Sequence, residues 1–250
     1  MRKHIFPAFN YTLTHLHQHP FKKLIWGQSS GIERKTISDE LGSRFNIPDE
    51  DSPQLSDYIN AWWQDGIVLF FPPKETMPHP IHLSSQAHLN PNTCAVERNY
   101  IKVGPQSRVS LILSSDWHSS DQAWGLSLTN IHLENTSRLE LLLINSSDEP
   151  VRIYNHLMVH LEENSQLLLV SADFIEGIGV VRREVFLHQR GGEARLRGVH
   201  IGKSQSHLDY RTRQIHFGDK TVSDLLFKSV LFDQSRSIYK VLIRVMPTAQ

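Results

Sequence analysis

A short pattern that returns every 28 residues constrains this chain more than any other feature of its sequence. Residues 131–137 (IHLENTS) return as residues 159–165 (VHLEENS), and less closely as residues 187–193 and 215–221. A fixed period of this length is typical of a solenoid, in which each repeat covers the apolar face of its neighbour. The repeat carries histidine at 132, 160, 188 and 216, and a small or polar residue five places on at Ser137, Ser165, Glu193 and Thr221.

Short apolar runs follow the polar part of each repeat, at residues 139–144, 167–170 and 196–201. They have the length of strands, and Asn, Gly, Asp or Ser bounds most of them. They are too short for a helical repeat, and no Asn recurs at the offset that a leucine-rich repeat requires. We therefore predict an all-β, right-handed parallel β-helix with coils of about 28 residues, each made of two or three strands, in which equivalent side chains stack in ladders.

The N-terminal part of the chain reads differently. Ser52-Pro53 is a helix start and Gly66 a helix stop, and the apolar residues between them, which include Trp62 and Trp63, have helical spacing. This pattern predicts a partly helical N-terminal region over residues 1–65, with the tryptophans in packing roles. A parallel β-helix over residues 66–250 follows it.

The entry to the predicted β-helix is rich in proline. Residues 67–71 form an apolar strand, and Pro78 and Pro80 frame a second short strand over residues 81–83. The first clear coil runs over residues 100–113, where Lys102 takes the position of the histidine. Cys94 lies before it in an Asn- and Pro-rich turn, and we expect a packing role for this lone cysteine.

Charge and composition exclude several classes of partner. Lys and Arg number 26 and Asp and Glu also number 26, so we expect neither nucleic acid nor a membrane as a partner. The chain has one cysteine and neither a membrane-length apolar run nor a signal peptide. These features predict a cytoplasmic protein.

Fifteen histidines are present, and three of them alternate at His15, His17 and His19. Alternating imidazoles on one face of a strand can bind a metal ion. The same residues can equally form a solvated segment before Pro20, and the sequence leaves both interpretations open.

Two runs of the chain resemble the SufB/SufD family of iron–sulfur cluster assembly proteins. Residues 191–198 (GGEARLRG) resemble a glycine-bounded run of that family, and residues 207–250 resemble its SufD end. Residues 65–68 (DGIV) with residues 80–83 (PIHL) resemble the entry to its β-helix. The resemblance covers about residues 65–250.

The resemblance implies a non-enzymatic, SufD-like scaffold that pairs with SufB and sits on the SufC ATPase, to which ATP hydrolysis would belong. It implies a transient iron–sulfur cluster at the subunit interface, with none held tightly by this chain alone. His216 matches the SufD histidine that serves as a nascent cluster ligand or interface residue, and we expect no catalytic residue. No cysteine follows Cys94, so the nucleophilic cysteine of SufB has no counterpart here.

Two departures from the family pattern limit what carries over. Neither Lys240 nor Val241 is the glycine that the family has where its last strand turns. The family also continues beyond the position of Gln250 into a helical domain that docks SufC, so the resemblance implies that this docking is missing here.

The residues alone leave other interpretations open. His132, His160 and His188 fit a structural, mainly neutral ladder with His216 as its last rung, and the β-helix can be an oligomerisation module without cluster chemistry. A β-helix carbohydrate-active enzyme would need carboxylates clustered around a cation. Of Glu134, Glu140, Glu162 and Glu163, only Glu134 and Glu162 keep the repeat. The β-prone residues 238–245 predict an open edge that a SufB-like subunit or a second copy joins.

Overall fold

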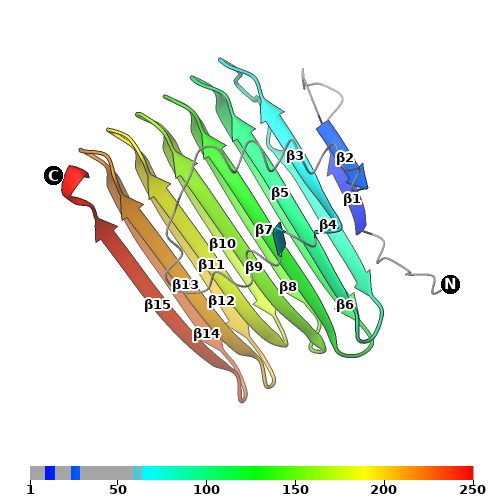
Figure 1. Cartoon of the computed structure of the whole chain (residues 1–250). Helices are drawn as coiled ribbons and strands as arrows, with labels where there is room; N and C mark the ends of the chain where they lie inside the picture. Colours follow the sequence, from blue (N-terminus) through cyan, green and yellow to red (C-terminus); the bar gives the residue numbers. More distant parts are fainter. Residues whose placement is uncertain (1–8, 15–23, 29–58, 61–62, 250) are drawn as a thin grey trace.

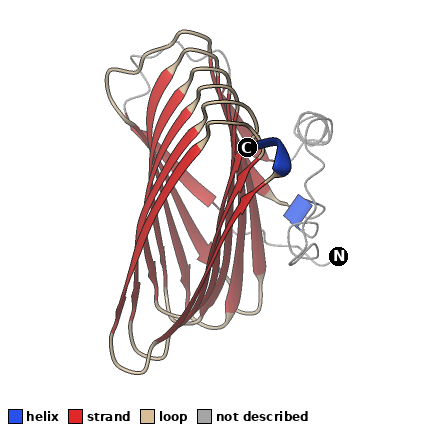
Figure 2. Ribbon diagram, turned by 90° about the vertical axis from the view of Figure 1, so that its left-hand side faces the viewer, coloured by secondary structure: helices blue, strands red, loops and turns tan. Residues whose placement is uncertain are grey.

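The computed structural model describes residues 9–14, 24–28, 59–60 and 63–249, and in it the chain forms a parallel β-solenoid of about 6 turns. Each turn contributes one strand to each of two facing sheets, called sheet A and sheet B below (Figure 1; Figure 2). The prediction of an all-β parallel β-helix is confirmed, and each coil has two strands.

Sheet A has seven strands and sheet B has eight, in the following orders. Sheet A runs β1 (Phe9–Thr14), β4 (Ile81–Leu89), β6 (Arg108–Ser119), β8 (Arg138–Ser147), β10 (Gln166–Ile175), β12 (Glu193–Gly202) and β14 (Val222–Leu231). Sheet B runs β15 (Arg236–Val245), β13 (His207–His216), β11 (Ile178–Leu187), β9 (Val151–Leu161), β7 (Ala123–Leu133), β5 (Cys94–Val103), β3 (Asp65–Phe71) and β2 (Leu24–Gln28). A short 3₁₀ helix, η2 (Pro247–Ala249), follows β15.

Alternate residues of each strand point into the space between the sheets, and most of them are aliphatic. Leu141 in β8 is buried and pairs in register with Leu111 of the preceding coil and Leu169 of the following one, and Leu169 pairs with Leu196. The repeat is therefore 30, 28 and then 27 residues between these leucines. Stacked apolar columns of this kind form the core, because each coil removes its neighbour's apolar side chains from water.

The turns that lead from sheet B to sheet A repeat one backbone shape. Each contains one residue with positive φ, a conformation that L-residues other than Asn and Asp rarely adopt. Hydrogen bonds between successive turns hold this shape: Thr136 N donates to Glu163 O at 2.8 Å and Asn164 N to Arg190 O at 2.9 Å. The positive-φ residues of this column are Gln106, Thr136, Asn164, Gly191 and Lys220.

The two ends of the solenoid differ. At the N-terminal end, β1 pairs antiparallel with β4 and β2 pairs antiparallel with β3, so the chain covers its own first strand edges. At the other end, β14 and β15 each have one hydrogen-bonded neighbour within the described residues. Figure 1 shows β1 and β2 at one end of the stack and β15 at the opposite end.

Most of the predicted N-terminal helix lies outside the described residues, as do His15, His17, His19 and Trp62. Within the described part, Trp63 N donates to Ile59 O at 3.0 Å, which is the i to i−4 bond of a helical turn. Ile59 and Trp63 are buried and belong to one apolar cluster with Val68 and Tyr100, on the outer face of sheet B. The packing role predicted for Trp63 is confirmed.

Candidate functional site

A column of polar side chains runs along the outer face of sheet B, near the ends of the strands. Lys102, His132 and His160 occupy equivalent positions in three successive coils, as the sequence repeat predicts. Each bonds to the first turn residue of the next coil: Lys102 to Glu134 at 2.9 Å and His132 to Glu162 at 2.9 Å. The column therefore starts as a series of ion pairs between coils.

The next contact in this column joins two imidazoles. His160 Nδ1 lies 2.9 Å from His188 Nε2, and the two ring planes are 11° apart. Burial, with the nearby histidines, holds the pKa of His160 well below its ordinary value, and burial lowers the pKa of His188 to about 4. Both rings are therefore neutral at pH 7, as the sequence predicted.

The prediction that His216 continues this ladder is wrong. His160 pairs in register with Phe186, not His188, and His216 pairs with Leu187. The turn after β11 has five residues where the turn after β9 has four, so the 28-residue numbering loses register there. For the same reason Gly192, not Glu193, takes the place of Ser165, since Glu193 pairs with Gln166.

His216 instead points into the solenoid. The equivalent inward residues of the preceding coils, Leu133, Leu161 and Leu187, are fully buried, and His216 is also buried. Its Nδ1 lies 2.7 Å from Thr221 Oγ1, and its Nε2 lies 2.9 Å from the hydroxyl of Ser223. Burial lowers the pKa of His216, so the ring offers a neutral nitrogen that can bind a metal ion once a hydroxyl moves away.

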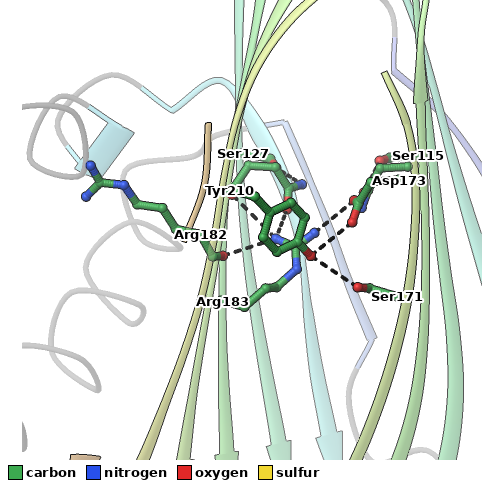
Figure 3. A network of polar contacts seen from close by, with 9 residues as sticks. Ser115, Ser127, Ser171, Asp173, Arg182, Arg183 and Tyr210 are labelled. Atoms are coloured by element: carbon green, nitrogen blue, oxygen red, sulfur yellow. Dashed lines mark hydrogen bonds and ion pairs between the residues drawn. The ribbon is translucent and has the colours of Figure 1, made fainter. Parts of the chain in front are cut away.

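A buried polar network, which the sequence analysis missed, crosses the middle of the core (Figure 3). Arg183 of β11 and Asp173 of β10 face each other across the interior at 3.1 Å, with side chains 0% and 1% exposed. The hydroxyl of Tyr210 donates to Asp173 Oδ2 at 3.0 Å and lies 3.2 Å from that of Ser171. Loss of the Asp173 interaction raises the cost of ionising Tyr210, whose pKa burial raises far above its ordinary value.

The network extends toward the N-terminal end through two amides. Asn145 donates to Asp173 at 2.5 Å, and Arg183 donates to Asn155 Oδ1 at 2.6 Å. Beside them lies a cavity of about 50 Å³ that hydroxyl, amide and leucine side chains line, with room for about three or four water molecules. The signal in the sequence was a strand whose inward alternation passes from Leu143 to Asn145, which can be recognised once the inward face is known.

The remaining predicted site residues do not gather into a site. Glu134 and Glu162 hold Lys102 and His132, whereas Glu140 lies on the outer face of sheet A and pairs with Arg138 at 2.8 Å. Among the described residues, no group of three or more His, Cys, Asp or Glu side chains is arranged to hold a metal ion. The carboxylates therefore give no support to a cation-dependent carbohydrate enzyme.

Cys94 is the first residue of β5, not a turn residue as predicted. It pairs in register with Trp124, and its side chain is half-buried. Burial raises the pKa of its thiol, which disfavours the reactive thiolate at neutral pH. This environment fits the packing role.

These features define a two-sheet parallel β-solenoid protein with one self-covered end and one uncovered end. The family model described as "SUF system FeS cluster assembly, SufBD core domain" matches residues 84–250, and the chain belongs to this family. Membership supports a role in iron–sulfur cluster assembly in the SUF system. No curated protein matches the chain. In the part of the chain that the structure describes, no helix has the length and apolar character needed to cross a membrane.

Proposed function

We propose that the chain is a SufD-like, non-enzymatic scaffold subunit that joins a SufB-like subunit, or a second copy of itself, through the end formed by β14 and β15. The nascent iron–sulfur cluster is its cargo, assembled at that interface. The observation that carries this proposal is the uncovered end of the solenoid, called the open end below.

The open end exposes the positions that are the core in every other coil. Thr212, Gln214 and His216 of β13 are buried, and they pair with Val241, Ile243 and Val245 of β15. Those three side chains are 49%, 54% and 56% exposed. An apolar face of this kind, with unpaired strand edges on both sides, favours the addition of another chain's strands.

The exposed apolar side chains are concentrated at this end. Among the described residues, ten of the fourteen exposed large hydrophobic side chains lie in β14, β15 or the turn between them. Burying them against a partner would contribute roughly 25 cal/mol for each Å² of apolar surface removed from water. They are Val222, Leu226, Val230, Leu231, Phe232, Ile238, Val241, Leu242, Ile243 and Val245.

The SufD side of the family is favoured by the cysteine content. A SufB-type scaffold would need a cysteine ligand in the β-helix, and no cysteine follows Cys94. Cys94 itself lies at the first residue of β5, eight strands before the open end in sheet and chain order combined with its half-buried environment. The partner would supply the thiolate, and ATP hydrolysis would belong to a SufC subunit.

His216 is the residue of this chain that we assign to the cargo or to the interface. It is the inward histidine of the last coil but one, next to the open end, and its neutral ring is suited to bind iron. A ligand role requires that one of its two hydroxyl partners, Thr221 or Ser223, gives up its hydrogen bond.

Co-purification with SufB and SufC subunits tests this assignment, with wild type compared with His216→Ala and His216→Leu. Leucine continues the column of Leu133, Leu161 and Leu187, so it preserves packing and removes only the nitrogen donors. Loss of cluster assembly in both variants with the complex intact supports a ligand role. Loss of the complex makes His216 an interface residue, and wild-type behaviour of His216→Leu on both counts refutes either role.

A structural oligomerisation module without cluster chemistry is the second candidate, because the open end serves self-association equally well. In that case the chain forms homo-oligomers through β14 and β15, and neither His216 variant changes cluster assembly in the presence of SufB and SufC.

A further inference from the structure

The chain is neutral as a whole, but the outer face of its last strand is basic. The outward residues of β15 include Arg236, Lys240 and Arg244, which are all exposed. β15 contains no Asp or Glu. The open end therefore combines an apolar inner face with a row of three cations at a spacing of four residues along one unpaired strand.

The neighbouring strand adds to this charge. Arg211 and Arg213 lie on the same outer face in β13, and Arg211 pairs with Lys240 in register. Arg211 holds Asp209 at 2.9 Å, which keeps the pKa of that carboxyl below its ordinary value, and Arg213 holds Glu184 at 3.1 Å. The nearby carboxylates are thus already engaged by arginines of this chain.

A second copy cannot match this row of charges. If two β15 strands pair antiparallel about a two-fold axis centred on Lys240, Lys240 faces itself and Arg236 faces Arg244 of the second copy. A slip of two residues sets Lys240 opposite Ile238 and Arg236 opposite Leu242. Neither register brings a carboxylate to the cations, and like charges directly opposite each other are destabilising.

Pairing of β15 with β14 of a second copy gives no better match. The outward face of β14 carries Asp224 and Lys228, whose charges cancel, and Asp224 already pairs with Arg197. A head-to-tail stack would bring β15 to the opposite end, where β1 and β2 have 6 and 5 residues against the 10 of β15. A copy of this chain is therefore a poor occupant of the open end.

We propose that the open end binds an extended strand of a different chain, one whose outer face carries carboxylates at a spacing of four residues and whose inner face is aliphatic. The carboxylates pair with Arg236, Lys240 and Arg244, and the aliphatic residues cover Val241 and Ile243. This proposal rests on the proposed function, and it selects a distinct subunit over a second copy. Charge complementarity at an interface sets partner choice and association rate more than affinity alone.

A charge-swapped copy of the chain supplies the required partner strand. The variant Arg236→Glu/Lys240→Glu/Arg244→Glu keeps the inner face and places three carboxylates at the required spacing. When it is mixed with wild type in low salt, we expect a mixed dimer by analytical ultracentrifugation, with a Kd at least tenfold lower than that of either protein alone. The difference should shrink at 1 M salt, where charges are screened over about 3 Å.

The matched control is Arg108→Glu/Arg195→Glu/Lys203→Glu, which makes the same charge change at exposed positions outside β15. Mixed with wild type, it should give no mixed dimer. Circular dichroism of both triple variants checks that the solenoid is intact.

Wild type that dimerises as tightly as the mixture, or a mixture that stays monomeric, overturns the inference. Either result leaves the role in cluster assembly standing, since that role is tested by co-purification. Conversely, a SufB subunit that binds the wild type and the charge-swapped variant equally well overturns this inference alone.

Discussion

The ring of His188 stacks on the ring of Phe217, with centroids 5.4 Å apart and planes 9° apart. This contact continues the column that begins with His132 and His160, and it replaces the imidazole expected from the sequence repeat with a phenyl ring. His216, one residue earlier, is thereby free to take an inward position. The structural column and the candidate ligand are therefore separate features.

The imidazole column predicts a dependence of stability on pH. The pKa of His188 is about 4 in the folded chain and near 6.5 in an unfolded one. Between these values the unfolded state binds more protons, so stability falls as the pH decreases from about 6.5 toward 4. The slope from this residue is at most about 1.4 kcal/mol per pH unit, and solvent contact reduces it.

Urea unfolding at several pH values between 7.5 and 5 measures this slope in wild type, His188→Phe and His188→Gln. Both variants should lose less stability on acidification than wild type, because neither can bind the proton. His188→Gln retains a group that can hydrogen-bond to His160 Nδ1. Equal slopes in all three proteins would rule out His188 as a source of the acid sensitivity.

The ion pair between Asp173 and Arg183 predicts a large effect of single substitutions in the core. Asp173→Asn or Arg183→Met leaves one charge buried without its counter-charge, and each should lower the free energy of unfolding by about 3–5 kcal/mol. The double variant should be less destabilised than the sum of the two, since it buries no unpaired charge. Chemical denaturation measures all three.

Arg138→Ala serves as the matched control, because Arg138 and Glu140 form an ion pair on the exposed face of sheet A. This surface pair should contribute only about 0–1 kcal/mol. If Asp173→Asn costs no more than Arg138→Ala, the interior network is not stabilised by its charges.

Gly66 predicts a steric requirement at the start of β3. A Cβ at this position would lie 1.8 Å from the carbonyl oxygen of Arg98, so the backbones of β3 and β5 must separate to admit alanine. We expect Gly66→Ala to cost about 3 kcal/mol, measured by thermal or chemical unfolding. At Gly192 the nearest atom is the Cδ2 of Leu187 at 3.5 Å, and Gly192→Ala should change stability by less than about 1 kcal/mol. Similar losses in both would contradict the close approach.

The fold was accessible from the sequence because its signal is periodic. The repeat of residues 131–137 at 159–165 predicts that Leu133 and Leu161 stack and that Lys102, His132 and His160 share a column, and both hold in the structure. Such predictions work where the turns keep a constant length, since each residue then returns to the same face of the coil.

The site was less accessible, because it depends on turn length and on contacts between the sheets. One extra residue in the turn after β11 moves His216 from the outer column to the interior. The contact between Asp173 and Arg183 joins residues of different sheets, and their facing positions follow from the register of both sheets together. A single sequence supplies neither quantity.

The most direct test of the proposed scaffold role is light scattering on a mixture of this chain with a SufB subunit. The variant Val241→Asp/Ile243→Asp charges the exposed inner face of β15, and Ile178→Asp makes a similar change at an exposed position on β11, away from the open end. Wild type and Ile178→Asp should form a stable complex with SufB, and the double variant should not. A wild-type chain that stays monomeric and does not bind SufB, or a double variant that binds as well as wild type, would contradict docking at the open end.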